Sequence, residues 1–456
     1  MSNIVNSAGR LDRLPIARFH WKILALIASG VFLDAFDMFL ANDSLAAMVK
    51  DGIANLHSGA MFISATFLGM VLGSAVSGYV GDRYGRRYAY QINLAIFGLA
   101  SIAACFAPDI QSLIVLRFIM GIGMGAEVVV AAGTLTEFVP SASRGKWISL
   151  AALIVNFALA TASLLGYWVI PRFGWRYMFA IAGIGALCVW FFRHRMPESP
   201  RWLESIGRLE EAEATIRTIE QEVETTAGKL PPVRRVFDIH VGITPFRTLF
   251  GRGMLSRTLT AAMTAIAINV GLYGFIAWLP TFFVKEGFSI VQSFGYMLFM
   301  SFGAPVGGLI SYFIADRVGR ARGIVCAALL SIVLGWVYVT LQNNVAIVIA
   351  GFGLITTIYV VMSLGILGYI PELFPTEIRL RGTGFASTSG RIVSVATPYI
   401  TLMLYQHYGV TGVIGFVSVT LIALCAAIIG LRIETSGQVL EDIAPAIEQV
   451  ASHVSS

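Results

Sequence analysis

Charged residues are scarce in this sequence: Asp, Glu, Lys and Arg make up only 13% of its 456 residues, whereas 57% are hydrophobic. One soluble core cannot hide so much apolar surface, so lipid is the expected solvent for much of the chain. Cysteine is scarce as well, and the four cysteines lie singly in apolar runs without CxxC spacing, at Cys105, Cys188, Cys326 and Cys425. We therefore expect no metal site and no disulfide framework. The sequence also shows no phosphate-binding loop, so we expect neither an enzyme that hydrolyses nucleotides nor a cofactor.

The chain is rich in long apolar runs. Twelve runs follow one another, and each is long enough to cross a hydrocarbon layer of roughly 30 Å as a helix. They span residues 21–48, 59–80, 88–107, 112–138, 146–170, 175–192, 258–284, 291–315, 323–341, 345–370, 384–406 and 410–431. The sequence thus predicts an all-α membrane protein with twelve transmembrane helices. The first run is too long to be the core of a cleaved signal peptide.

Lys and Arg predict how these helices are oriented, because short loops rich in positive charge stay on the cytoplasmic side. With the amino terminus inside, 26 of the 32 Lys and Arg residues fall on the cytoplasmic side, four fall outside and two fall within spans. The opposite orientation would invert this bias, so both termini are expected in the cytoplasm. The net charge of +6 then reflects topology and does not indicate nucleic-acid binding.

Two different motifs each occur twice along the chain. GYVGDRYGRR, which contains Asp82, has a counterpart in IADRVGRAR, which contains Asp316, 234 positions later. EFVPSASRG begins at Glu137, and ELFPTEIRLRG begins at Glu372, 235 positions later. Two motifs that repeat at nearly one offset imply two halves of six helices each.

The sequence divides accordingly into four parts. Apolar residues at three- and four-residue spacing from Trp202 to Ile219 predict an amphipathic helix in the loop between the halves. The expected parts are an amino-terminal six-helix bundle at 1–192, a cytoplasmic linker with that helix at 193–257, a carboxy-terminal six-helix bundle at 258–432 and a cytoplasmic tail at 433–456.

These motifs resemble those of a known group of transporters. GYVGDRYGRR is similar to the signature loop between the second and third helices of the major facilitator superfamily, DRVGRA to its second copy, and RFIMGIGMGAE to its RxxxGxGxG helix. PESPRWLESIGRLEEAEATI resembles the stretch after helix six in sugar porters. LDAFD and GAEVVVAAGTLTEFVP resemble proton-linked metabolite symporters, including nicotinate and aromatic-acid carriers. The resemblance covers nearly the whole chain and implies two parallel six-helix repeats with alternating access through a central cavity.

Charged residues at the cytoplasmic ends of the spans form a duplicated pattern. The aspartate of each signature motif is followed within four residues by arginines, and a carboxylate there can cap a helix and pair with arginine. Glu137 is expected to pair with Arg144, and Glu372 with Arg379 or Arg381, as the resemblance also implies. Such ties must break when the transporter opens to the inside. The predicted gate network comprises Asp82, Arg83, Arg86, Glu137, Arg144, Asp316, Arg317, Arg320, Glu372, Arg379 and Arg381.

Five ionisable residues lie within the spans and away from their ends, namely Asp34, Asp37, Arg117, Glu127 and Arg391. Each charge near mid-bilayer costs about 2.5 to 3.5 kcal/mol on insertion scales, so these residues are the first candidates for function. Asp34 and Asp37 lie three residues apart, on one face of the first span and near mid-depth. Any of the three carboxylates can carry a proton, since burial and a like-charged neighbour favour the neutral acid. Alternatively, Asp34 or Asp37 is a permanent partner of Arg117 or Arg391, and Arg117 is the candidate for a structural ion pair.

Arg391 in the eleventh span can bind a carboxylate with two parallel hydrogen bonds, which favours an organic acid as the substrate. Other residues within spans that can line the central cavity are Asn156, Asn269, Tyr273, Trp278 and Tyr359. The sequence predicts a secondary transporter of a cell membrane, with a bacterial inner membrane favoured, which carries a small metabolite together with protons. This architecture can work as a monomer, and the sequence leaves the oligomeric state open. A proton-driven exporter and an uncoupled facilitator of a sugar-like solute are the alternatives.

Overall fold

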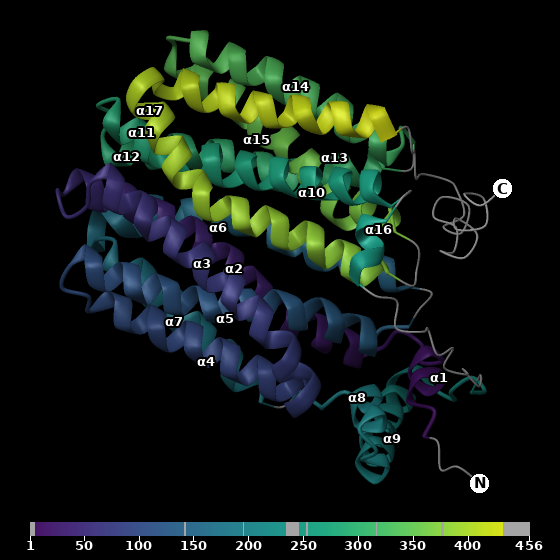
Figure 1. Ribbon diagram of the computed structural model, residues 1–456. Helices are drawn as coiled ribbons and strands as arrows, with labels where there is room; N and C mark the ends of the chain where they lie inside the picture. Colours follow the sequence, from purple (N-terminus) through teal and green to yellow (C-terminus); the bar gives the residue numbers. More distant parts are fainter. Residues whose placement is uncertain are drawn as a thin grey trace. The chain divides into compact units, whose positions relative to one another are not determined.

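A computed structural model describes residues 5–140, 143–194, 196–233, 246–251, 254–315, 317–374 and 378–431 (Figure 1). Within these residues all regular secondary structure is helical, which confirms the predicted all-α class. The tail predicted at 433–456 and the gate residue Asp316 lie outside the described residues, as does the side chain of Asp82.

Eleven helical segments of the described residues are long and apolar enough to cross a membrane. The last of them, Arg381–Gly430, has 50 residues and is interrupted at Gly409 by φ 60° and ψ −154°, so it holds two helices. The count therefore agrees with the twelve predicted spans, whose last boundary falls at this break. The helices of the spans are α2 (Arg18–Lys50), α3 (Leu56–Tyr84), α4 (Arg86–Cys105), α5 (Ile110–Phe138), α6 (Arg144–Phe173), α7 (Arg176–Arg193), α10 (Leu255–Val270), α11 (Leu279–Lys285), α12 (Ile290–Ser301), α13 (Gly303–Ile314), α14 (Arg320–Thr340), α15 (Asn344–Leu364), α16 (Ile370–Glu372) and α17 (Arg379–Leu431).

Contacts between residues divide the chain into two compact units, which we call unit 1 and unit 2. Unit 1 comprises Met1–Met38, Leu68–Ala158 and Phe179–His240, and unit 2 comprises Phe39–Phe67, Leu159–Met178 and Val241–Ser456. Helices α2, α3, α6 and α7 therefore contribute residues to both units. The boundaries of the two six-helix halves stay a prediction.

In unit 1, helix α5 packs against its neighbours backbone to backbone. A β-carbon on Gly125 of α5 would meet the carbonyl oxygen of Met70 in α3, and one on Gly123 would lie 2.6 Å from the carbonyl oxygen of Asn93 in α4. Real β-carbons do not come so close to a carbonyl oxygen, so these crossings need a residue without a side chain. The RxxxGxGxG motif thus has a packing role in this chain.

The two copies of the signature motif end in the same backbone conformation. Gly85 precedes α4 with φ 100° and ψ 160°, and Gly319 precedes α14 with φ 98° and ψ 154°. Residues with a β-carbon rarely adopt such a positive φ, so glycine is needed at both turns. The repeat in the sequence is therefore also a repeat in structure.

Three helices gather at one end of unit 1, namely α1 (Ser7–Asp12), α8 (Pro200–Ser205) and α9 (Leu209–Ala227) (Figure 1). The amphipathic stretch predicted in the linker is helical but is divided at Gly207, where φ is 81°. The apolar face of α9 is buried in a core that also contains residues of α1 and the ends of α5 and α6. This packing holds the linker against the ends of membrane helices.

Ion pairs also tie α1 to the linker helices, and we call this cluster the amino-terminal clasp. Arg10 of α1 contacts Glu213 of α9 and lies 2.6 Å from Glu220, and Arg13 lies 2.7 Å from Glu220. Glu204 of α8 accepts hydrogen bonds of 2.9 and 2.8 Å from two backbone N–H groups at the start of α1. The sequence analysis assigned no role to these residues.

Removal of the Glu220 carboxylate is expected to open the amino-terminal clasp. Hydrogen bonds from arginine to a carboxylate contribute roughly 1.5 to 3 kcal/mol, so Glu220→Gln should speed hydrogen exchange of α1 about 10- to 100-fold at neutral pH, measured by mass spectrometry. Glu224→Gln, on the exposed side of α9, is the matched control. Equal exchange of α1 in both variants would contradict the role given to Glu220.

The clasp should also open in acid. Burial raises the pKa of Glu220, but the hydrogen bonds and charges of Arg10 and Arg13 outweigh it and hold the pKa below its ordinary value of 4.5. Because the pKa is lowered in the folded state, the stabilisation is present above pH 4.5 and is lost as the pH falls through the folded-state pKa.

Unit 2 combines α10 to α17 with segments of α2, α3 and α6 and the first residues of α7. Ser64 of α3 donates a hydrogen bond of 2.8 Å from Oγ to the carbonyl oxygen of Val395 in α17. Phe67, one turn further along α3, packs edge to face on the ring of Tyr273 with centroids 4.5 Å apart. Segments that are far apart in the sequence therefore contact one another within this unit.

Candidate functional site

A buried ion pair joins α2 to α5 inside unit 1. Nη1 of Arg117 contacts Oδ2 of Asp37, and the two residues are 1% and 0% exposed. The other carboxylate oxygen, Oδ1 of Asp37, is buried and accepts no hydrogen bond from the described residues. Of the partners that the sequence left open for Asp37, the structure places Arg117 beside it. A buried carboxylate with one oxygen on arginine can still bind a proton on its second oxygen.

The other two predicted proton carriers lie in the same unit. Asp34 is one turn from Asp37 on the same face of α2 and is 4% exposed. Glu127 of α5 lies 2.5 Å from Nη1 of Arg193, which is the last residue of α7. Unit 1 thus holds two buried ion pairs, Asp37 with Arg117 and Glu127 with Arg193, of which only Arg193 lies outside the predicted spans.

In unit 2, the seventh span changes its helix type where two predicted substrate residues lie. Helix α10 passes into a π-helical turn at Gly271–Phe275, which contains Tyr273, and then into a 3₁₀ turn at Ile276–Trp278. Helix α11 follows directly. Single π-helical turns within longer helices are frequent at functional sites because they redirect the side chains that follow.

Polar side chains gather beside this turn in what we call the Arg391 cluster. Ser394 of α17 donates a hydrogen bond of 2.9 Å to Oδ1 of Asn269, whose Nδ2 donates one of 2.8 Å to the carbonyl oxygen of Ala265. Arg391, half-buried and one turn before Ser394 on α17, lies near the phenol of Tyr273. The structure therefore brings Asn269, Tyr273 and Arg391 together, and Ser394 joins them although the sequence analysis did not single it out.

The remaining substrate candidates are deeply buried. Trp278 is 1% exposed, stacks on Phe282 with centroids 6.1 Å apart, and its Nε1 donates no hydrogen bond to the described residues. Tyr359 of α15 is 2% exposed and lies near Tyr273. Asn156, 5% exposed, belongs to unit 1 and so is not a member of the Arg391 cluster.

The signature motifs carry the same ion pair in both copies. Nε of Arg86 lies 3.3 Å from Oε1 of Glu137, and Nη1 of Arg320 lies 2.7 Å from Oε1 of Glu372. The two arginines are 234 positions apart and the two glutamates 235, as are the motifs to which they belong. In each pair the arginine lies at the start of the helix that follows the signature loop, which is α4 or α14. The glutamate lies at the end of the next span, in α5 or α16, so each pair joins two successive spans.

The other members of the predicted gate network have different surroundings. Arg144 lies 3.9 Å from Asp12 of α1, whereas Glu137 pairs with Arg86, so the predicted pair of Arg144 with Glu137 is not found among the described residues. Nε of Arg379 donates a hydrogen bond of 3.4 Å to a backbone carbonyl oxygen. The guanidinium of Arg83 lies 5.8 Å from the ring centroid of Tyr84, Arg317 is exposed and Arg381 is half-buried.

Glu198, to which the sequence analysis gave no role, caps helix α4. Its Oε1 accepts hydrogen bonds from the backbone N–H groups of Arg86 at 3.0 Å and Arg87 at 3.3 Å. Burial raises the pKa of Glu198 above its ordinary value, although the N–H donors of Ser199, Arg87 and Arg86 act in the opposite direction. The residue belongs to the PESPRW stretch, so this motif joins the linker to the loop of the first signature motif.

Two further buried charges escaped the sequence analysis. Arg193 was assigned to the loop after the sixth span, and only its side chain reveals that it is a partner of Glu127. Asp43 of α2 is 3% exposed, and its Oδ2 would lie 2.7 Å from a β-carbon on Gly166 of α6. Asp43 stands near the end of its predicted span, where a charge is ordinary, so the pattern offered no signal for it.

Apolar helices of membrane-spanning length, duplicated charged turns and buried ion pairs define a secondary transporter of the membrane. The sequence matches the family described as sugar (and other) transporters over residues 24–446. The chain belongs to this family, within the major facilitator superfamily that its motifs indicated. It is a multi-pass membrane transporter and not an enzyme.

Relatives cover nearly the whole chain. The inner membrane metabolite transport protein YdjE of Escherichia coli K12 is 39% identical over 440 residues, which are 95% of this chain and 97% of that protein. The niacin transporter NiaP of Acinetobacter baylyi is 32% identical over 444 residues, 95% of this chain and 98% of that protein. Among solved structures, the xylose transporter XylE of E. coli in a partially occluded inward open conformation has a TM-score of 0.74 at 19% identity and covers 93% of this chain and 100% of its own. This last likeness shows the shared fold.

Proposed function

We propose that this transporter couples the entry of a small organic acid to the entry of protons. The observation that carries the proposal is the ion pair between Asp37 and Arg117, which is buried inside two membrane helices and leaves Oδ1 of Asp37 without a donor among the described residues. Protonation of Asp37 weakens its attraction to Arg117, so α2 and α5 are held together differently in the two protonation states. A proton can thereby bias the conformational change that carries substrate across.

The Arg391 cluster supports an anionic substrate. Arg391 supplies a permanent positive charge inside a span, and Asn269, Ser394 and Tyr273 add hydrogen-bonding groups beside it. A guanidinium can hold a carboxylate with two parallel hydrogen bonds, which gives orientation as well as affinity. The similar niacin transporter is named for a carboxylic acid, and this supports the same substrate class.

The two ion pairs of the signature motifs, Arg86 with Glu137 and Arg320 with Glu372, serve in this proposal as ties that break and re-form as the transporter opens and closes. Their equivalent positions in the two repeats support a shared task. Both pairs are partly exposed, so solvent weakens them and the free energy needed to break each pair is small, about 1 kcal/mol or less.

Thermal stabilisation of the purified protein tests the substrate class. Nicotinate and nicotinamide have the same ring and differ in charge, so nicotinate should raise the melting temperature and nicotinamide should not. A ligand at about 100 times its Kd stabilises the folded state by roughly 2.7 kcal/mol. Arg391→Gln should weaken nicotinate binding about 10- to 100-fold, whereas Arg391→Lys should retain part of it, because it keeps the charge and loses the paired hydrogen bonds. Stabilisation by nicotinamide or xylose, with none by any carboxylate, would contradict the proposal.

A further inference from the structure

The proposed function gives a role to the ion pair of Asp37 with Arg117 but none to the second buried ion pair of unit 1, which joins Glu127 to Arg193. Nη1 of Arg193 in α7 lies 2.5 Å from Oε1 of Glu127 in α5, and both side chains are 1% exposed. Oε2 of Glu127 is buried and accepts no hydrogen bond from the described residues. Glu127 therefore has, like Asp37, one oxygen on an arginine and one oxygen on which a proton can bind.

Arg193 is held in place independently of Glu127. Its Nε donates a hydrogen bond of 2.7 Å to the carbonyl oxygen of Leu26, and its Nη2 donates one of 3.1 Å to that of Ile27. Its guanidinium carbon lies 4.5 Å from the centroid of the Tyr90 ring. Because three contacts fix this cation, Glu127 can gain or lose a proton while Arg193 stays where it is.

One face of α2 joins the two ion pairs. A β-carbon on Gly30 would meet both Nη2 of Arg193 and Oε1 of Glu127, so the second pair lies against Gly30. Gly30, Asp34 and Asp37 follow one another at helical spacing on one face, over about 10 Å at 1.5 Å per residue. Asp34, 4% exposed, stands between the two pairs. Three buried carboxylates thus follow one another along this side of α2.

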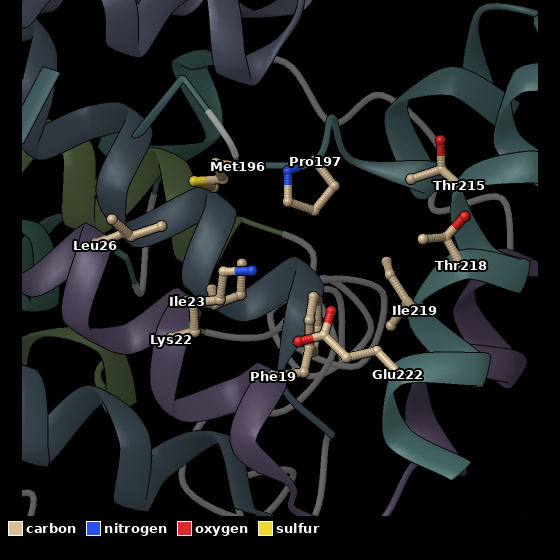
Figure 2. Close-up of a pocket in the computed structure, with 10 residues that line it drawn as sticks. All are labelled: Phe19, Lys22, Ile23, Leu26, Met196, Pro197, Thr215, Thr218, Ile219 and Glu222. Carbon is tan, nitrogen blue, oxygen red and sulfur yellow. The ribbon is translucent and has the colours of Figure 1, made fainter. Parts of the chain in front are cut away.

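A cavity of about 340 Å³ lies at the start of α2, in the part of unit 1 that also carries α9. Figure 2 shows Ile23 and Leu26 of α2 on one side of this cavity and Thr218 and Ile219 of α9 on the other. Leu26 lines the cavity and its carbonyl oxygen accepts the hydrogen bond from Arg193, so one residue of the cavity wall also contacts the second ion pair. The space is large enough for about ten waters, and Thr218 is exposed to solvent.

We propose that Glu127 is a second proton-binding group, which exchanges protons with Asp37 through Asp34 and with the aqueous side through the cavity at the start of α2. In each step an O–H proton passes from a carboxylic acid to the oxygen of a carboxylate or to water, with no other bond changed. The inference rests on the proposed proton coupling and adds where the proton leaves. Glu127 faces the cation of Arg193 and the backbone of α2 at Gly30, and Arg193 in turn contacts the ring of Tyr90.

An infrared pH titration of the purified protein tests this inference without any substrate. The wild type should show the carbonyl band of a protonated carboxylic acid that Glu127→Gln removes, whereas the control Glu224→Gln should keep it. Thr218→Trp, which fills the cavity from the exposed side of α9, should slow the shift of this band in heavy water at least about tenfold. A band unchanged by Glu127→Gln, or a shift that the filled cavity does not slow, would overturn the inference.

Gly30→Ala keeps the inference testable if Glu127→Gln does not fold. The added methyl group displaces the ion pair, so the pH at which the band appears should move, and an unmoved band would count against the role of Glu127. The titration needs no transported solute, so its failure would leave symport through Asp37 standing. Absence of proton movement with substrate in the wild type would instead overturn the proposed function.

Discussion

Replacing Asp37 by asparagine is expected to abolish proton-driven accumulation while substrate exchange across the membrane continues. With one proton per substrate and no membrane potential, a pH difference of one unit can drive about tenfold accumulation. The amide of asparagine cannot take up a proton, so the accumulated ratio in vesicles should fall from about tenfold to one. Counterflow, in which labelled and unlabelled substrate exchange without net proton movement, should remain within about a factor of three of the wild type.

The same substitution leaves Arg117 buried without its counter-charge, and removing one partner of a buried pair costs about 3 to 5 kcal/mol. The single variant is therefore expected to melt at a lower temperature. The double variant Asp37→Asn with Arg117→Gln removes both charges and should recover stability without recovering accumulation. Full accumulation by the single or double variant would contradict the role given to Asp37.

Replacing Gly125 by leucine is expected to destroy the packing of α5 and with it the folded protein. Any β-carbon at this position meets the carbonyl oxygen of Met70 in α3, and a backbone atom cannot move aside as a side chain can. Overpacking costs typically 1 to 3 kcal/mol where side chains can adjust, so about 3 kcal/mol or more is expected here. The fraction of monodisperse protein after extraction in detergent, and its melting temperature, measure the loss.

Gly415→Ala in α17 is the matched control for Gly125→Leu. A β-carbon on Gly415 meets nothing within 4 Å, so alanine should be tolerated or should stabilise the helix slightly. If the Gly125→Leu protein is as monodisperse and stable as the control, α3 and α5 can separate easily. This result would contradict the packing role given to the RxxxGxGxG motif.

The helices could be predicted closely because a membrane span needs about 20 apolar residues in a row and little else. Helix α5 begins at Ile110 where the prediction began at 112, and the last two spans separate at Gly409 as expected. The π-helical turn at Gly271–Phe275 could not be predicted, because its apolar composition equals that of an ordinary helix. Such a turn depends on what packs against it.

The site was harder to predict than the fold. Whether a charged side chain is buried depends on residues that are distant in the sequence and become its neighbours only in the folded protein. Asp37 and Arg117 stood out as charges in apolar runs, but nothing in the sequence distinguished Asp34 from Asp37 as the partner of Arg117. Arg193 was hidden by its position at the end of a span, where arginine normally marks the cytoplasmic border. Only the fold shows that its side chain is buried on Glu127.

Proton movement in vesicles that contain the purified transporter tests the central claim most directly. The organic acid that stabilises the protein best is added outside, with the membrane potential held at zero, and the external pH is followed with a dye. The account predicts that the medium becomes more alkaline with wild-type protein as substrate enters, and that Asp37→Asn removes this signal. Entry of the acid into wild-type vesicles without any change in external pH would contradict proton-coupled symport.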